Sequence, residues 1–199
     1  MTAAQVADVK SNTAAIDVTA QVQAALDGCI SVYANPGKYK ITAQLIGRGV
    51  NMKLTGAGEL ATQFDKRFSG DLMLMQNGGS EWASFGIIGN GATYAGAGIK
   101  VSGNSNTIKK IRIRDTRDSG ILTVAKTAVY LTVEDAFLLP TDTSHTFGIR
   151  QTGGGRLRAR VDCAHVLAHF WWGCARGFFG NERRAPDQFH RHQYQVFQK

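Results

Sequence analysis

The sequence predicts an all-β fold, a right-handed parallel β-helix whose short strands stack in successive coils. Glycine is frequent and proline is scarce, with 23 Gly and 3 Pro in 199 residues, which favours many tight turns over rigid linkers. Short strands also recur in two interleaved series. This texture divides the chain into an N-terminal helical segment (residues 1–27), the predicted β-helix (residues 28–152) and an irregular, atypical basic tail (residues 153–199).

The first segment has the periodicity of helices. Four residues at 3-4-3 spacing form a short heptad-like seam: Val6, Val9, Thr13 and Ile16. Such a seam predicts a small coiled-coil bundle, with a frayed amphipathic terminus as the alternative. Asp17 or Thr19 can cap a second helix, and Gly28 is placed to end it.

From residue 30 the period of the hydrophobic pattern changes to two. Apolar residues alternate with others in residues 30–33, 41–45 and 50–54, and Asn-Pro-Gly (35–37) and Gly-Arg-Gly (47–49) separate these stretches. Such patterning predicts short strands between turns, in a sandwich, a barrel or a β-helix.

Two repeated strand types decide between these folds. The first type is apolar-x-apolar and occurs at residues 85–87, 111–115 and 131–135. The second begins with Gly-Ile and occurs at Gly98, Gly120 and Gly148, in steps of 22 and 28 residues. Because each coil of a solenoid contributes one strand to each face, interleaved series of this kind favour a β-helix over an antiparallel sandwich.

The opening of the predicted solenoid has a family likeness. Residues 24–27 (Ala-Ala-Leu-Asp) precede Val-Tyr-x-x-Pro-Gly-x-Tyr-x-Ile at 32–41 and Leu-x-Gly-x-Gly at 54–58. This arrangement resembles the start of phage tailspike proteins and pectate-lyase-like β-helix enzymes, although the Asp-Tyr-Gly-Ala type of lead-in is absent. The resemblance implies a helix that caps the first coil, and a homotrimer whose long grooves bind, and in some members cleave, bacterial polysaccharide.

The residue pattern and composition change after residue 155. Residues 1–155 hold 15 Lys and Arg against 12 Asp and Glu, whereas residues 156–199 hold 8 against 3. This part is rich in Arg, His, Trp and Cys and has no strand alternation, so it is interpreted as a frameshift product or a disordered extension. No zinc site is predicted in this part, because the spacing of its candidate ligands fits no common zinc pattern: Cys163, His165, His169 and Cys174.

Three acidic residues at strand ends are the candidate catalytic groups. Aligning Ile113 with Val133 stacks Asp115 on Asp135, with the carboxylates about 5 Å apart, close to the separation in a retaining glycosidase. Glu134 is the third candidate. The alternative is structural, because Asp at a strand end commonly caps a turn.

Aromatic rings are the candidate sugar platforms. Trp82, Tyr94 and Tyr130 can stack on sugar rings, although burial in the solenoid is equally compatible with Tyr130. Phosphate loops, a nucleophile elbow and metal-protease motifs are absent, so no cofactor or metal is predicted.

The predicted function is that of a phage or prophage tailspike-like protein. It would recognise capsule or lipopolysaccharide O-antigen as a homotrimer, and depolymerisation of the same polysaccharide is left open as a second activity. Binding to nucleic acid and insertion into a membrane are not expected. A virion location, or an extracellular one after cell lysis, follows from the lack of a signal peptide in the first 30 residues. The alternatives are a monomeric extracellular polysaccharide lyase or hydrolase, and a structural virion component without activity.

Overall fold

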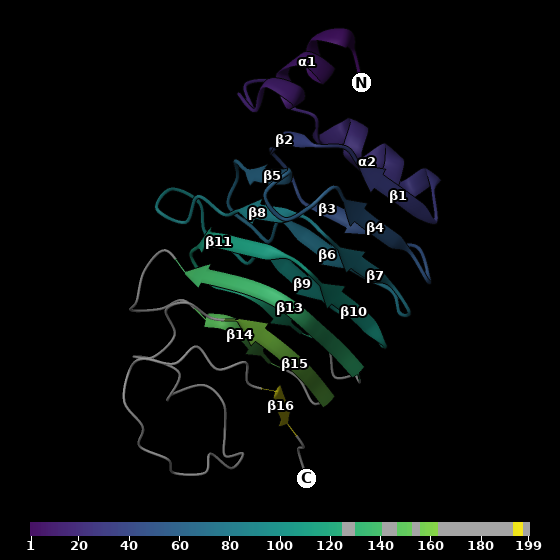
Figure 1. Cartoon of the computed structure of the whole chain (residues 1–199), viewed down its shortest axis with the longest axis vertical. Helices are drawn as coiled ribbons and strands as arrows, with labels where there is room; N and C mark the ends of the chain where they lie inside the picture. Colours follow the sequence, from purple (N-terminus) through teal and green to yellow (C-terminus); the bar gives the residue numbers. More distant parts are fainter. Residues whose placement is uncertain (125–129, 141–146, 153–155, 163–192, 197–199) are drawn as a thin grey trace.

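A computed structural model describes residues 1–124, 130–140, 147–152, 156–162 and 193–196, and these residues form a parallel β-solenoid behind two short helices (Figure 1). Each coil contributes a strand to three faces, and like strands stack in parallel. The predicted parallel β-helix is therefore confirmed. Among the described residues no helix is long and apolar enough to cross a membrane.

The three faces collect strands that recur once per coil, and the coils are numbered one to five from the N-terminal end. Face 1 contains β1 (Ser31–Ala34), β4 (Lys53–Gly56), β7 (Glu81–Ala83), β10 (Asn106–Lys109), the first half of β13 (Tyr130–Pro140), and β15 (Arg156–Asp162). Face 2 contains β2 (Gly37–Ile41), β5 (Thr62–Lys66), β8 (Gly86–Ile88), β11 (Arg112–Thr116) and the second half of β13. Face 3 contains β3 (Leu45–Gly47), β6 (Met73–Met75), β9 (Ile99–Val101), β12 (Ser119–Thr123) and β14 (Phe147–Gln151). A further strand, β16 (Gln193–Val196), pairs antiparallel with β15.

Inward-pointing side chains form one ladder per face and fill the lumen. On face 1 the ladder is Val32, Leu54, Trp82, Ile108 and Val133. On face 2 it is Tyr39, Phe64, Ile87, Ile113 and Leu138. On face 3 it is Leu45, Met73, Ile99, Ile121 and Ile149. All but Val32 and Ile149 are buried, and burying each large apolar side chain contributes about 1.5–3 kcal/mol.

One residue in the left-handed conformation joins face 1 to face 2 in three successive coils. Ser84, Lys110 and Asp135 have φ of 60°, 51° and 49°, and the strand of face 2 follows almost directly. The backbone continues the stack here, since Ser84 N donates to Lys109 O (3.2 Å) and Lys110 N donates to Glu134 O (2.9 Å). We call this line of residues, together with the segments 35–36 and 57–61 that join the same two faces in the first two coils, the 1/2 corner. Its side chains lie outside the lumen.

This corner explains an error in the predicted repeat. The Gly-Ile series is confirmed, because Ile99, Ile121 and Ile149 are paired in register. The other series mixed two faces: Val133 aligns with Ile108 on face 1, and Ile113 aligns with Leu138 on face 2. β13 belongs to both faces, because a single left-handed residue, Asp135, bends it in the middle. The bend has no glycine or proline to mark it in the sequence.

Parallel stacking continues past residue 152, where the solenoid was predicted to end. β15 pairs with β13 in parallel, with Leu157 aligned with Leu131 and Ala159 with Val133. The seven residues of β15, which belong to the predicted irregular tail, therefore continue the parallel stack. The Cys and His residues weighed as a zinc site lie outside the described part of the chain.

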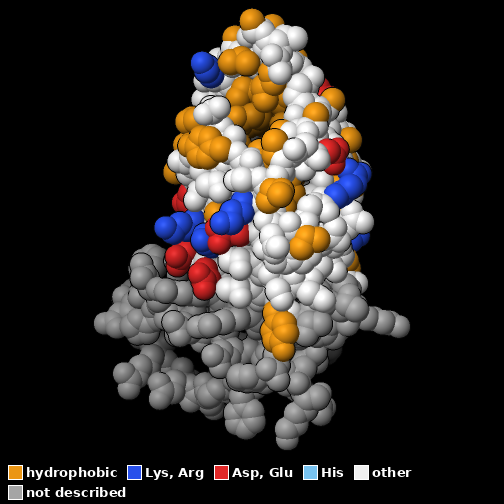
Figure 2. Space-filling model, turned by 90° about the vertical axis from the view of Figure 1, so that its right-hand side faces the viewer, with side chains coloured by type: hydrophobic (Ala, Val, Ile, Leu, Met, Phe, Trp, Pro, Cys, Tyr) orange, Lys and Arg blue, Asp and Glu red, His pale blue; other side chains and the backbone are white. Residues whose placement is uncertain are grey.

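The two helices cover the N-terminal end of faces 2 and 3. The helix α1 (Ala3–Ser11) begins with a capping box between Thr2 and Gln5 and packs on β2, while α2 (Thr19–Gly28) packs on β3. The Gln23 side chain hydrogen-bonds Ile46 N and O at 2.8 and 3.0 Å, as a further strand would. Face 1 lacks such a cover among the described residues. Figure 2 shows apolar side chains in a hollow at that end.

The predicted N-terminal seam is wrong, whereas the second helix is confirmed. Thr13 and Ile16 lie beyond the end of α1, in the linker between the helices, so the four residues do not share a helical face. Asp17 Oδ1 accepts hydrogen bonds from the backbone N (3.0 Å) and hydroxyl (2.5 Å) of Thr19 at the start of α2, and Gly28 is the last residue of that helix.

The linker is held by a carboxylate. Asp8 is buried and accepts hydrogen bonds from the Thr13 hydroxyl, from Ala15 N (3.1 Å) and from Ile16 N (3.0 Å). These bonds, the one from Thr13 foremost, hold the pKa of Asp8 below its ordinary value. The pKa of Asp17 is also lowered: its burial opposes the shift, but hydrogen bonds from Thr19 and Thr42 outweigh it.

Replacing Gly37 by Ala is expected to loosen the α1 cap. Gly37 has φ of 145°, and a Cβ there would lie 2.5 Å from Val9 Cγ1 and 2.6 Å from Val9 O. Strain and displacement of α1 should lower the free energy of unfolding by about 1–3 kcal/mol in denaturant titrations. Gly28→Ala is the control, since a Cβ at Gly28 meets nothing within 4 Å. Equal stability of the two variants would contradict the packing of α1 on β2.

Acid should weaken the cap through Asp8. Because the pKa of Asp8 is lower in the folded state, the ionised carboxylate stabilises the fold above about pH 4, and this contribution is lost as the pH falls through the lowered folded pKa. Asp8→Asn places an amide NH₂ against Ile16 N–H. It should therefore lower the thermal midpoint at neutral pH and flatten its acid dependence. Asp27→Asn, at an exposed carboxylate paired with Arg48, is the control and should leave the acid dependence in place.

Candidate functional site

Two open hollows lie one above the other along the 1/2 corner. The upper hollow, of about 720 Å³, is lined by Lys10, Asn12, Asn35, Pro36, Gly37, Leu60, Ala61 and Gln63. The lower hollow, of about 370 Å³, is lined by Gly58, Glu59, Ser84, Lys110 and Asp135. Residues 57–61, the loop between β4 and β5, contribute to both hollows and separate them. The corner thus presents an indented strip that crosses all the coils.

The loop at residues 57–61 owes its shape to backbone contacts with neighbouring coils. The Thr62 hydroxyl donates to Ala34 O in the coil above (3.1 Å) and accepts from Ala57 N (2.9 Å), while Gly58 N donates to Ser84 O in the coil below (2.9 Å). Glu59 O lies against Gly86, where a Cβ would be only 2.3 Å away. Glycine at position 86 therefore allows the loop to fold down over the third coil and overhang the lower hollow.

Charges of both signs surround the lower hollow. Figure 2 shows Lys and Arg side chains beside Asp and Glu side chains on its left, the side of the 1/2 corner. Glu59, Lys110 and Asp135 line the hollow, and Lys109 Nζ pairs with Glu81 Oε2 at 2.8 Å on face 1. Both partners of that pair are about one-third exposed, so it contributes at most about 1 kcal/mol to stability. The strip can donate and accept hydrogen bonds along its whole length.

The predicted carboxylate stack is not formed. Asp135 belongs to the 1/2 corner with Lys110, whereas Asp115 lies beyond the far end of the face 2 ladder, after Arg114. Glu134 aligns with Lys109, not with Arg114. The alignment behind the prediction was shifted by one face, so the structure does not bring Asp115, Asp135 and Glu134 together as a catalytic group.

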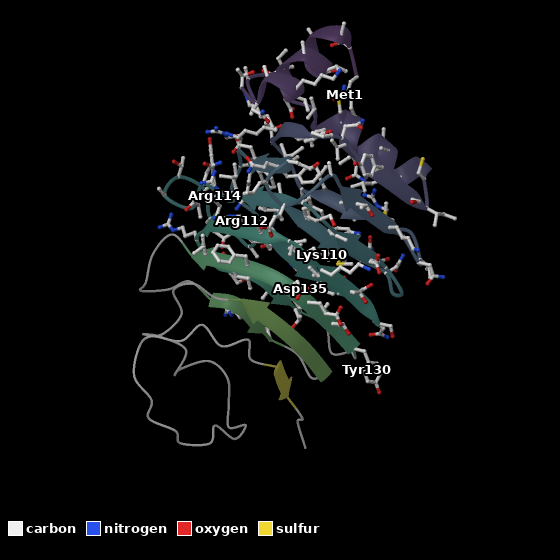
Figure 3. All side chains as sticks on the ribbon, viewed as in Figure 1. Met1, Lys110, Arg112, Arg114, Tyr130 and Asp135 are labelled. Atoms are coloured by element: carbon white, nitrogen blue, oxygen red, sulfur yellow. The ribbon has the colours of Figure 1, made fainter. Side chains whose placement is uncertain are left out.

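The three predicted sugar platforms have different surroundings. Trp82 is 0% exposed and fills the lumen against Gly47, so its ring is unavailable to a ligand and that prediction is wrong. Tyr94 is half-buried in the loop after β8. Tyr130, at the start of β13, is 52% exposed and stands at the edge of face 1 (Figure 3). Tyr33, 59% exposed near the end of β1, is a further ring that the sequence analysis did not single out.

Two buried charges were also missed. Asp65 Oδ2 lies 2.9 Å from the Arg67 guanidinium and 3.4 Å from Lys38 Nζ, and its Oδ1 accepts from Asn90 Nδ2 at 2.5 Å. Lys66 is 0% exposed and Nζ donates to Ala95 O at 2.5 Å.

Burial and nearby charges shift the pKa of Lys66 in opposite directions. Desolvation lowers the pKa of Lys66, and the negative charges of Asp71 and Asp118 partly oppose the shift. Together with Asp65, this ammonium holds the loop at residues 89–97 against coil two. Both groups are satisfied by protein partners, so their role is structural.

Comparisons with known proteins give one similar solved structure. No protein-family model and no curated protein matches the chain. A solved structure described as "Geobacillus virus E2 - ORF18" is similar to it, with a TM-score of 0.46 and 14% identity, over 76% of this chain and 38% of that one. The chain thus spans less than half the length of that phage protein.

Lys110→Asn is expected to stabilise the protein. A left-handed backbone costs a long side chain about 1 kcal/mol, whereas Asn tolerates it, and Lys110 has φ of 51°. The free energy of unfolding should rise by about 0.5–1 kcal/mol. Lys53→Asn, at an exposed strand position on face 1, is the control and should give no gain because Asn is unfavourable in strands. A loss of stability at position 110 would contradict the corner geometry.

Proposed function

We propose that this chain is a tailspike-like protein of a phage or prophage that binds polysaccharide of the bacterial surface along the 1/2 corner. The observation that carries the proposal is the pair of hollows stacked along the solenoid axis. Coils stack at about 4.8 Å, so the strip from coil one to coil five is about 19 Å long. An extended, open strip suits a chain-like ligand better than a compact small molecule.

The lining of the strip supports a polysaccharide as the ligand. Sugars combine many hydroxyl groups with weakly apolar ring faces, and the strip offers matching groups of both kinds. Asn12, Asn35 and Gln63 provide amide groups, and Leu60 is a 63% exposed apolar side chain between the two hollows. Tyr33 lies two residues before Asn35, so an aromatic surface is available beside the upper hollow.

The proposed activity is binding, without cleavage by the predicted carboxylates, because Asp135 lies at the 1/2 corner and Asp115 at the far end of face 2. In this proposal the chain is part of a virion and assembles as a homotrimer, as the sequence resemblance implies. Binding is tested with the purified chain and immobilised capsular polysaccharides and lipopolysaccharides from a panel of bacteria. Assays for new reducing ends and unsaturated products in the same samples test cleavage. Retention on none of the panel would contradict the proposal.

Leu60→Ala is expected to weaken binding to a retained polysaccharide severalfold, because it removes the apolar contact between the hollows. Val50→Ala is a matched control: Val50 is 62% exposed, close to the 63% of Leu60, but does not line either hollow. Dissociation constants from surface plasmon resonance check the prediction. Equal effects of the two substitutions would place the binding surface elsewhere.

A further inference from the structure

The fourth coil concentrates positive charge on the outside of the solenoid. Five basic residues occur within residues 109–117: Lys109, Lys110, Arg112, Arg114 and Arg117. Ile111 and Ile113 between them point into the lumen and are 0% and 1% exposed. This alternation leaves the basic side chains on the outer surface, and Figure 3 shows Lys110, Arg112 and Arg114 following one another along the coil. We call Lys110, Arg112 and Arg114 the basic row.

The positive charge of the row is only partly neutralised. Arg114 Nη1 lies 4.0 Å from Asp115 Oδ2, at the limit of an ion pair. Among the described residues, no carboxylate lies within 4.0 Å of the charged nitrogens of Lys110 or Arg112. In contrast, Lys109 is paired with Glu81, and Lys38 and Arg67 are paired with Asp65.

The Arg112 side chain is held in place by an aromatic ring. Its guanidinium carbon lies 4.5 Å from the centroid of Phe137, the residue aligned with it in the next coil. Stacking on a ring restricts the side chain while leaving N–H groups at the guanidinium edge for a ligand. Such an arginine loses little conformational freedom when it binds an anion.

Small residues in the third coil leave the row accessible from above. Gly86 is aligned with Arg112, and Ser84 occupies the corner position above Lys110. The loop at residues 57–61 lies over Gly86 through Glu59 O, so it forms the upper wall of the lower hollow while Lys110 lines the hollow from below. A ligand in the lower hollow can therefore reach the row.

We propose that the basic row binds the acidic groups of an anionic polysaccharide. The ligand class rests on the proposed function, whereas the anion site rests on the row itself. A planar guanidinium donates two parallel hydrogen bonds to a carboxylate or phosphate, and the nearby ammonium adds a second positive charge. A polysaccharide fits this surface better than a nucleic acid, because its hydroxyl groups can donate hydrogen bonds to Glu59, Glu134 and Asp135 beside the row.

The purified chain is tested for binding to alginate, to alginate whose carboxyl groups have been reduced to alcohols, and to single-stranded DNA. Native alginate should bind at low salt, and reduction or added salt should weaken binding about tenfold or more, equivalent to one paired charged group. Arg112→Gln and Arg114→Gln should each weaken binding to native alginate severalfold, and Arg112→Lys should restore part of the loss. Lys53→Gln, a basic residue on face 1 away from the row, is the matched control and should have little effect.

The outcomes separate this inference from the proposed function. Equal binding of native and reduced alginate, no binding of either, or unchanged affinity of both arginine variants would overturn the inference, even if the panel of bacterial polysaccharides is still bound. Stronger binding of DNA than of alginate would overturn the choice of ligand. Loss of panel binding with retained, Arg112-dependent alginate binding would contradict the proposed function and keep the anion site. Circular dichroism of each variant checks that the solenoid is folded.

Discussion

The parallel backbone stacking of successive coils is the constraint on which the rest of the molecule depends. For strands to stay aligned over five coils, each corner must recur with nearly the same geometry, and a left-handed residue between faces 1 and 2 meets that requirement in coils three to five. The side chains at such a corner do not point into the lumen of the solenoid. Ser84, Lys110 and Asp135 therefore stand outside in line, and a ladder of backbone bonds becomes a strip of polar groups on the surface.

The sequence was sufficient for the fold because strand alternation and turn residues are local signals. The Gly-Ile series could be aligned by eye, since Gly98, Gly120 and Gly148 mark the same point of face 3. The candidate site was not predictable in the same way. The bend at Asp135 lies inside an unbroken strand, so Val133 was matched to the wrong face. The Trp82 side chain points into the lumen, but its direction depends on the pairing register of β7. Hydrophobic alternation does not determine that register in a strand of three residues.

Sequence patterns could not predict the two hollows, for a different reason. They exist because the loop at residues 57–61 folds onto Gly86, a contact between segments one coil apart that has no motif of its own. The basic row was visible as a run of charges, but its meaning depends on the neighbouring coils. The same residues placed next to acidic side chains would form structural ion pairs, as Lys109 does with Glu81. Placed below Ser84 and beside Phe137, they remain available to a ligand.

The buried ammonium of Lys66 has a consequence for how the chain folds. Lys66 belongs to coil two, yet the carbonyl oxygens that accept its hydrogen bonds, those of Ala95 and Gly96, follow the strand of coil three on face 2. An intermediate with coil two formed and coil three unformed would bury a charge without partners or leave the lumen open, and either costs several kcal/mol. Solenoids otherwise gain stability coil by coil. This single side chain therefore couples two coils, and a solenoid that stopped growing between them would be destabilised.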